Sequence, residues 1–118
     1  KKGLERNGYL HFDRIWTFKY FYYLTDVKNS SDGPLRVVPK SHHLGVRMRS
    51  SQVGKPYELQ KNRIRIDYPE IYKSIKDEMT PIFGNAGTLI IFDTDTFHMG
   101  GIVSNNGERK ICRLHMRK

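Results

Sequence analysis

The sequence predicts a mainly β protein with a jelly-roll (cupin-like) core and one helix, and three observations support this fold class. Short runs of β-branched and aromatic residues recur along the chain, as they do in strands. Clusters of glycine, proline, asparagine and aspartate separate these runs, as in turns. Only residues 68–79 carry apolar side chains at helical spacing. In a jelly roll, facing strands can aim side chains from distant parts of the chain at one interior point.

The predicted strands follow these runs in order. The continuous apolar run at 17–27 is typical of a long buried strand, and the alternation at 63–66 indicates an edge strand. The other predicted strands are residues 7–13, 34–38, 81–83, 88–92 and 109–116. The stretch 43–62 shows no sustained period, so we expect a long loop there.

The one predicted helix spans residues 68–79. Its apolar residues form a single stripe, which we expect to pack into the core; they are Tyr68, Ile71, Tyr72, Ile75 and Met79. Asp67 and Glu70 are spaced for a start that resembles a capping box, and Pro69 is tolerated in the first turn.

Length and cysteine content restrict the class of protein. The 118 residues suffice for a single domain, 1–118, with one core. Cys112 is the one cysteine, which excludes an internal disulfide and favours a reducing, intracellular compartment. No run is apolar enough for a membrane span or a signal peptide. Because the first residue is not Met, we expect the C-terminal part of a longer jelly-roll protein, without its N-terminal part.

The chain is basic, with 21 Lys+Arg against 12 Asp+Glu and a formal charge of +9. Much of this charge lies in the middle of the chain, at Arg47, Arg49, Lys55, Lys61, Arg63 and Arg65. Nucleic acid is a partner we do not favour, because no recognised motif is present and only Tyr57 could stack on bases there. We expect instead either a solvated loop or a pocket rim or lid that attracts a small anionic substrate, with Arg63 and Arg65 as candidate contacts.

His11, Asp13 and His98 are candidate metal ligands. Residues i and i+2 of a strand point to the same face, so a strand at 7–13 places His11 and Asp13 side by side. A second histidine from a facing strand completes two imidazoles and one carboxylate, a ligand set typical of Fe(II) with open positions. Each residue alone is more often an ordinary packed or surface side chain. Their order on predicted strands, with Arg109 eleven residues after His98, favours the metal.

The order of motifs resembles that of the phytanoyl-CoA dioxygenase family over essentially the whole chain. The motifs are His11-Phe12-Asp13, Tyr23-Leu24-Thr25-Asp26, Gly33-Pro34-Leu35, Val38-Pro39-Lys40-Ser41-His42, Gly87 to Phe92, His98 and Arg109. The resemblance implies a double-stranded β-helix and an Fe(II)- and 2-oxoglutarate-dependent dioxygenase. Such an enzyme would use O2 to hydroxylate an unactivated C–H bond of a small substrate, with ascorbate as a supporting reductant.

The resemblance also implies roles for single residues. His11, Asp13 and His98 would bind the catalytic iron, and Arg109 would pair with the distal carboxylate of 2-oxoglutarate. Arg113 lies four residues on and is an alternative to Arg109. Tyr22 would lie near the co-substrate, although ordinary core packing explains it equally well.

Three positions depart from the family pattern or qualify it. Lys40 stands where the turn usually has glycine, and Gly100 stands where a small hydroxyl residue is common. His42 lies close to the motif, and we expect it to brace the turn rather than bind metal.

Three other functions remain open at this point. One is a catalytically inactive binding or scaffold protein of the same fold, and another is a basic nucleic-acid-binding module. The third is a cupin-like metal enzyme that uses no 2-oxoglutarate, against which Arg109 argues.

Overall fold

The computed structural model describes residues 8–117, which form two three-stranded antiparallel sheets and a helical region. One sheet has the strand order β4-β1-β6 and the other β3-β2-β5. The strands are β1 (Phe18–Tyr23), β2 (Leu35–Val37), β3 (Thr80–Ile82), β4 (Leu89–Asp93), β5 (His98–Met99) and β6 (Ile111–Met116). The helices are α2 (His42–Ser50), α3 (Ile64–Asp67) and α4 (Pro69–Ile75), with short 3-10 turns η1 (Tyr57–Leu59) and η2 (Lys76–Glu78).

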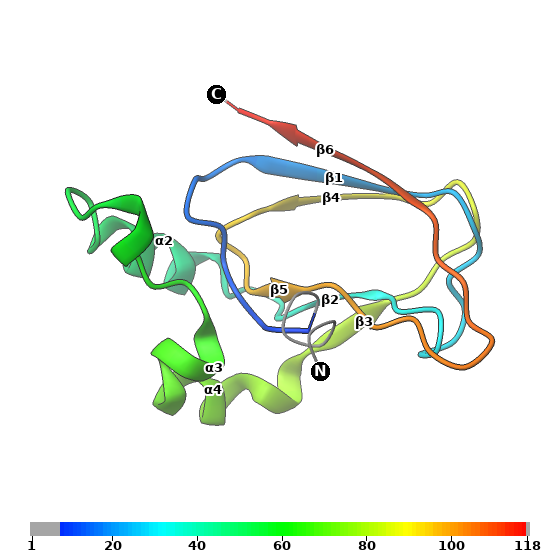
Figure 1. The fold of residues 1–118 in the computed structure, drawn as a ribbon, viewed down its shortest axis with the longest axis horizontal. Coiled ribbons are helices and arrows are strands. Elements are labelled where there is room, and N and C mark those ends of the chain that lie inside the picture. The colour runs from blue at the N-terminus through cyan, green and yellow to red at the C-terminus, as the bar shows by residue number, and fades with distance from the viewer. Residues whose placement is uncertain (1–7, 118) are drawn as a thin grey trace.

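The two sheets lie one above the other, and the helices gather beyond one end of them (Figure 1). In the described residues neither sheet closes or curls into a barrel, so the predicted mainly β jelly roll with one helix is replaced by a mixed α/β arrangement. The strands β2, β3 and β5 have only two or three residues each, which is too short to wrap around a core. Among residues 8–117 no helix has the length and apolar character required to cross a lipid bilayer.

The predicted strand at 17–27 is confirmed over Phe18–Tyr23, but it is buried on one face only. Lys19, Phe21 and Tyr23 point inward, whereas Phe18 and Tyr22 are exposed. β1 is the central strand of its sheet, between β4 and β6. The opposite face of this sheet is apolar and exposed, with Phe18, Tyr22, Leu89, Ile91, Leu114 and Met116.

Tyr23 joins the two sheets. Its side chain is fully buried, and its hydroxyl donates a hydrogen bond of 2.8 Å to the carbonyl of Ile82 in β3. The same oxygen accepts a hydrogen bond of 3.1 Å from the backbone N–H of Leu35 in β2. Burial raises the pKa of Tyr23, so this hydroxyl stays protonated and keeps its donor role. One polar atom thus fixes the spacing of the sheets.

The predicted loop at 43–62 is wrong in part, because it contains α2 and η1. The sequence did not predict this helix because its apolar residues show only weak helical spacing and its exposed residues are mostly polar. Tertiary contacts stabilise it. Met48 is buried in the core, and the guanidinium of Arg49 forms a bidentate ion pair with the carboxylate of Asp95, with N···O distances of 2.7 and 2.9 Å. A Cβ atom at Gly45 would collide with the backbone carbonyl of Asp95, so glycine permits this close approach.

The predicted edge strand at 63–66 is also wrong, because Ile64–Asp67 is the short helix α3. Four alternating residues do not separate the two structures, and only Ile64 is buried while Ile66 is 67% exposed. The carboxylate of Asp67 accepts a hydrogen bond of 3.0 Å from the backbone N–H of Arg63, at the start of the helix. This bond stabilises the first turn.

The predicted helix at 68–79 is confirmed over Pro69–Ile75, and 3-10 geometry continues it to Glu78. Pro69 occupies the first turn, as expected, but no side chain caps the helix at Tyr68, so the predicted capping box does not form. The apolar stripe packs as predicted against the core cluster, which consists of Leu10, Phe12, Val38, Met48, Ile64, Ile75 and Phe97.

The remaining strand predictions differ in how well they hold. Those at 34–38, 81–83, 88–92 and 109–116 are confirmed with shifted ends by β2, β3, β4 and β6. The predicted strand at 7–13 is wrong over the described residues, because only His11 makes bridge contacts there. Residue 7 lies outside the described residues.

The turn after β2 requires Lys40 to adopt a left-handed backbone conformation, with φ of 63°. Side chains with a Cβ atom pay about 1 kcal/mol in this region, whereas glycine does not. The lysine is exposed, so the departure from the family's glycine carries a conformational cost without a visible contact that offsets it.

We therefore expect Lys40→Gly to stabilise the protein by about 1 kcal/mol, because it removes this conformational cost. Chemical denaturation measures the change. Lys73→Gly is the matched control: Lys73 lies exposed in α4, where glycine should cost about 1 kcal/mol. Equal destabilisation by both substitutions would contradict the account of this turn.

Candidate metal centre

The two histidines are brought together by a local backbone pairing. The N–H of His11 donates to the carbonyl of His98 at 2.9 Å, and the N–H of His98 donates to that of His11 at 2.8 Å. This reciprocal antiparallel bridge places the imidazole rings on the same side, with centroids 4.3 Å apart. The predicted strand is absent, yet a single bridge suffices to place both side chains.

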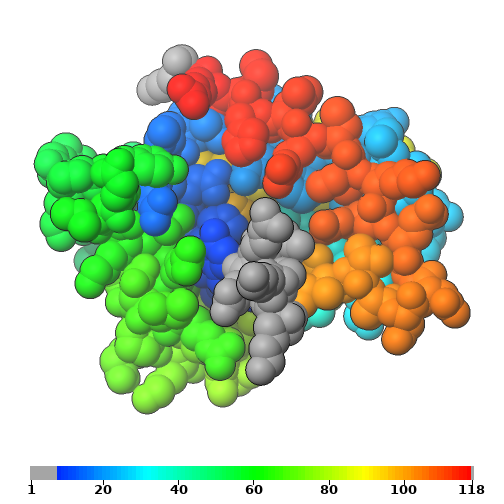
Figure 2. Space-filling view, in the orientation of Figure 1, coloured from blue at the N-terminus to red at the C-terminus, as the bar shows by residue number. Residues whose placement is uncertain are grey.

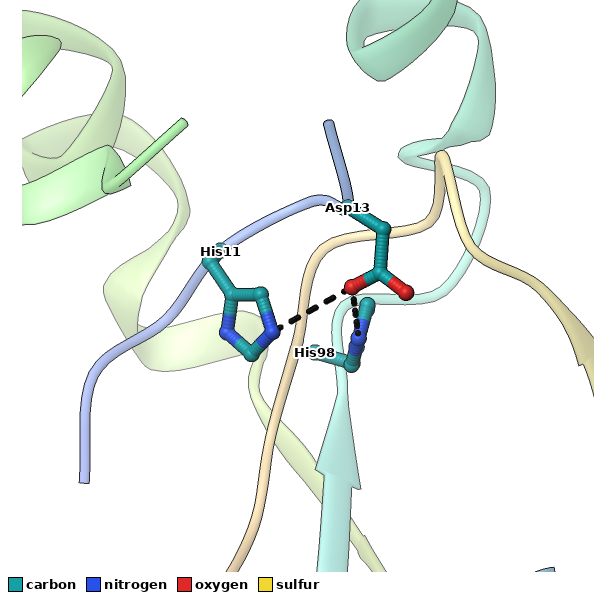
Figure 3. Close-up of side chains that lie close together, drawn as sticks. All are labelled: His11, Asp13 and His98. Atoms are coloured by element: carbon teal, nitrogen blue, oxygen red, sulfur yellow. Dashed lines mark ion pairs between the residues drawn. The ribbon is translucent and has the colours of Figure 1, made fainter. Parts of the chain in front are cut away.

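Asp13 completes the group. Its backbone N–H donates a hydrogen bond of 3.0 Å to the carbonyl of Thr94. Its carboxylate lies on the same side of the segment as the imidazole of His11. Oδ1 of Asp13 lies 3.4 Å from Nε2 of His11 and 3.1 Å from Nε2 of His98 (Figure 3). One ligand atom from each residue lies within 4.8 Å of the others. The three predicted residues therefore meet, and we call them the triad.

The outer ring nitrogens of both histidines contact backbone carbonyls. Nδ1 of His11 lies 3.0 Å from the carbonyl of Tyr9, and Nδ1 of His98 lies 2.6 Å from that of Thr96. A carbonyl can only accept, so each Nδ1 carries a proton, and in a neutral ring Nε2 is left with a lone pair. Metal-binding histidines commonly show this arrangement, because the outer bond fixes the tautomer and the ring orientation.

In the neutral ring of His98, the lone pair of Nε2 faces the carboxylate of Asp13. Nε2 of His98 is buried and has no hydrogen-bond partner within the described residues, although Oδ1 of Asp13 is only 3.1 Å away. Two acceptors at this distance repel unless a cation lies between them. The donor set and this unpaired nitrogen fit a divalent metal ion.

Charge states at neutral pH agree with this description. Burial lowers the pKa of His98 to about 4, so its imidazole is neutral. Burial alone would raise the pKa of Asp13, but the positive charge of Lys19, 3.1 Å from Oδ2, helps to hold it well below its usual range. The triad therefore offers the neutral imidazole of His98, a second imidazole from His11 and one carboxylate.

Sequence reasoning missed Lys19. Its side chain is only 9% exposed, and Nζ lies 3.1 Å from Oδ2 of Asp13. The sequence could have indicated it, because the alternation of side chains along a strand places Lys19 on the same inward face as Phe21 and Tyr23. A lysine at an inward position of an apolar strand is rare unless it is paired.

Ser41, rather than His42, braces the turn that supports His98. Its hydroxyl donates to the carbonyl of Val38 at 2.7 Å and accepts from the N–H of Phe97 at 2.7 Å. His42 is exposed as the first residue of α2 and contacts the ring of His43. Among the described residues, the side-chain hydrogen bonds that brace this turn come from Ser41 and none from His42, which is not a member of the triad.

A cavity of about 240 Å³ adjoins the triad on the side of the β4-β1-β6 sheet. Both predicted co-substrate arginines line it, together with His11, His98 and Lys19. Arg109 is half-buried, donates from Nη1 to the carbonyl of Gly33 at 2.7 Å, and has its pKa lowered by burial. Arg113 is exposed. The structure does not bring Tyr22 here, because it lies on the outer face of β1.

A second cavity, of about 340 Å³, adjoins His11 and Asp13 and carries basic and aromatic side chains. Arg63 lies over the ring of Tyr9 at 4.7 Å, and Arg14 lies over that of Tyr57 at 4.9 Å. Arg65 is exposed beside Tyr72 and does not line this cavity. In the space-filling view, dark-blue atoms of the N-terminal segment reach the surface beside the green helical region (Figure 2).

The lowered pKa of His98 predicts how stability depends on pH in the metal-free protein. Between pH 6.5 and about 4, unfolded His98 binds a proton that the folded state does not bind. The free energy of unfolding should therefore fall by as much as about 3 kcal/mol as pH decreases through this window. Urea denaturation at several pH values measures it. His98→Asn should flatten this dependence while the exposed His43→Asn should not, and an unchanged slope in His98→Asn would refute the assignment.

Comparison with known proteins gives one match. No curated protein and no solved structure matches the chain. The family model described as phytanoyl-CoA dioxygenase (PhyH) matches residues 6–111. This span contains the whole triad and Arg109. The chain belongs to the phytanoyl-CoA dioxygenase family.

Proposed function

We propose that the protein is an Fe(II)- and 2-oxoglutarate-dependent dioxygenase that hydroxylates an unactivated C–H bond of a small organic substrate. The observation that carries this proposal is the convergence of two imidazole Nε2 atoms and one carboxylate oxygen within 4.8 Å. Family membership supports the same activity.

The donor set favours iron over a structural zinc ion. A structural zinc site uses four protein ligands, whereas the described residues offer three. Two imidazoles and one carboxylate on one face are typical of Fe(II) oxygenases, since they leave positions for co-substrate and O2. Bound iron with 2-oxoglutarate would supply the oxidising chemistry, and ascorbate would keep the iron reduced.

The 240 Å³ cavity is the proposed site for 2-oxoglutarate. It is smaller than the pockets that hold drug-sized ligands, which suits a small dicarboxylate. The guanidinium of Arg109 would pair with the distal carboxylate, because its planar donors match a carboxylate. Arg113 is the alternative, but it is exposed, so water would weaken its pairing more. Phe21 and Leu35 line the same cavity and would exclude water from the reaction.

The fold assignment at this level is also part of the proposal. We infer that residues 1–118 form one domain and that its two sheets belong to the double-stranded β-helix of the family. Two observations support this fold assignment. The chain forms two antiparallel sheets, and the triad lies where the N-terminal segment meets β5. The domain would be the C-terminal part of such a core.

The second cavity is the proposed site for the substrate, which we expect to be anionic. Arg63 and Arg14 are each stacked on a tyrosine, which restricts their motion while their N–H groups stay able to bind a carboxylate or phosphate. The cavity includes His11 and Asp13, so a substrate bound there would lie beside the metal.

An inactive binding protein of the same fold would bind iron but would not release succinate from 2-oxoglutarate. This result would distinguish it from the proposed enzyme. A nucleic-acid-binding module would show an affinity that falls steeply with salt concentration. The tyrosines beside Arg14 and Arg63 are covered by guanidinium groups, which leaves less ring surface for stacking on bases.

Substitution of the triad tests the proposed activity. We expect His11→Ala and Asp13→Ala to lower iron-dependent succinate production from 2-oxoglutarate by roughly two orders of magnitude, because each removes a metal ligand. Succinate is measured with Fe(II), ascorbate and O2 present. The exposed His43→Ala should retain activity. Undiminished succinate production by both triad variants would refute the proposed activity.

Arg63 and Arg65 form a matched pair for the substrate site. We expect Arg63→Gln to raise KM for an anionic substrate by about tenfold, because a charge-assisted contact is lost. Arg65→Gln should leave KM unchanged, because Arg65 lies outside the cavity. Carboxylates and phosphate esters that stimulate succinate release serve as substrates, beside their uncharged analogues. Equal KM values in the two variants would contradict the assignment.

A further inference from the structure

We propose that Lys19 is a positioning residue of the metal centre, which restricts Asp13 to a single ligand oxygen. The inference rests on the proposed function, because it concerns how the same triad would hold its metal. Lys19 lies on β1, six residues beyond Asp13 in sequence, and is not itself a member of the triad.

The two carboxylate oxygens of Asp13 have different partners. Oδ1 lies 3.1 Å from Nε2 of His98 and 3.4 Å from Nε2 of His11. Oδ2 lies 3.1 Å from Nζ of Lys19. One oxygen therefore converges with the two imidazoles, while the other is held by the ammonium group. In Figure 3 the dashed lines from both rings end on the same oxygen of Asp13.

The surroundings of Lys19 restrict where its ammonium group can go. The residue pairs with Phe92 of β4 and His115 of β6 on either side, and Nζ lies 6.0 Å from the centre of the Phe92 ring. The side chain is 9% exposed, and among the described residues Asp13 is its one carboxylate partner. A buried ammonium group without this partner would be costly, so the contact with Oδ2 is strongly favoured.

The number of ligand oxygens decides how many positions on the metal stay open. An octahedral ion has six positions. Two imidazoles and one carboxylate oxygen fill three of them and leave three. A carboxylate that turned and bound through both oxygens would leave two, and a co-substrate that chelates the metal would need both. By holding Oδ2, Lys19 preserves the position that O2 requires.

A role limited to charge neutralisation would give a different result. Lys19 would then stabilise the metal-free protein, and its loss would change stability without changing how Asp13 binds a metal. The number of water molecules on a bound ion separates the two roles, because it reports the ligand mode of Asp13 and not the stability of the fold.

Mn(II) provides this measurement without turnover, because water-proton relaxation depends on the number of exchangeable waters that the bound ion keeps. Lys19→Met removes the charge at similar side-chain length. We expect its Mn(II) complex to lose about a third of the relaxation enhancement, as three open positions become two. Lys19→Arg, which retains a cation, and Lys73→Met, which removes an exposed lysine of α4, should match the original chain.

The outcomes are distinct. An unchanged enhancement in Lys19→Met would overturn the inference and leave the metal centre intact. If Lys19→Met does not fold, the original chain still decides, because an enhancement that corresponds to two waters would contradict a single ligand oxygen. Failure of the original chain to bind Mn(II) more tightly than His98→Ala would instead overturn the proposed metal site.

Discussion

The structure depends on one electrostatic constraint, the meeting of two imidazole Nε2 atoms and a carboxylate oxygen within 4.8 Å of one another. Both Nδ1 atoms are fixed by backbone carbonyls, so neither ring can turn its proton toward Asp13 without breaking a hydrogen bond. His98 is buried and neutral, which leaves its Nε2 facing an anion. This arrangement is electrostatically unfavourable when no cation lies between the two groups, and it becomes favourable around a divalent cation.

The surrounding elements hold this arrangement from three directions. The N-terminal segment and β5 share the reciprocal bridge between His11 and His98. The turn after β2 supports β5 through the hydroxyl of Ser41. The other sheet contributes Lys19 to the far oxygen of Asp13, and Tyr23 fixes the distance between the sheets. The site is thus placed by contacts between elements, and hardly by regular secondary structure.

This explains which parts could be predicted from the sequence. The triad was predictable because residues two apart point the same way in any extended segment, even where a full strand does not form. Strands with apolar alternation, such as β4 and β6, were predictable for the same reason. The helix α2 was not, because the contacts that hold it are tertiary: Met48 is buried in the core, and Arg49 pairs with Asp95, which is far away in sequence.

Other features depended on information that spacing does not carry. Four residues at 63–66 fit a strand and a helix equally, and the hydrogen bond to Asp67 decides for the helix. Tyr22 was placed near the co-substrate by resemblance, whereas the alternation of β1 directs it outward. The same alternation points to Lys19, so this residue could have been found from the sequence by asking which side chains of the strand face inward.

The most direct test is an anomalous-diffraction map of crystals grown with Co(II), which locates the ion without reference to turnover. The account predicts one peak bonded to Nε2 of His11, Nε2 of His98 and a single oxygen of Asp13, at about 2.0–2.2 Å from each. An ion bound elsewhere, or no peak between these three side chains, would contradict it.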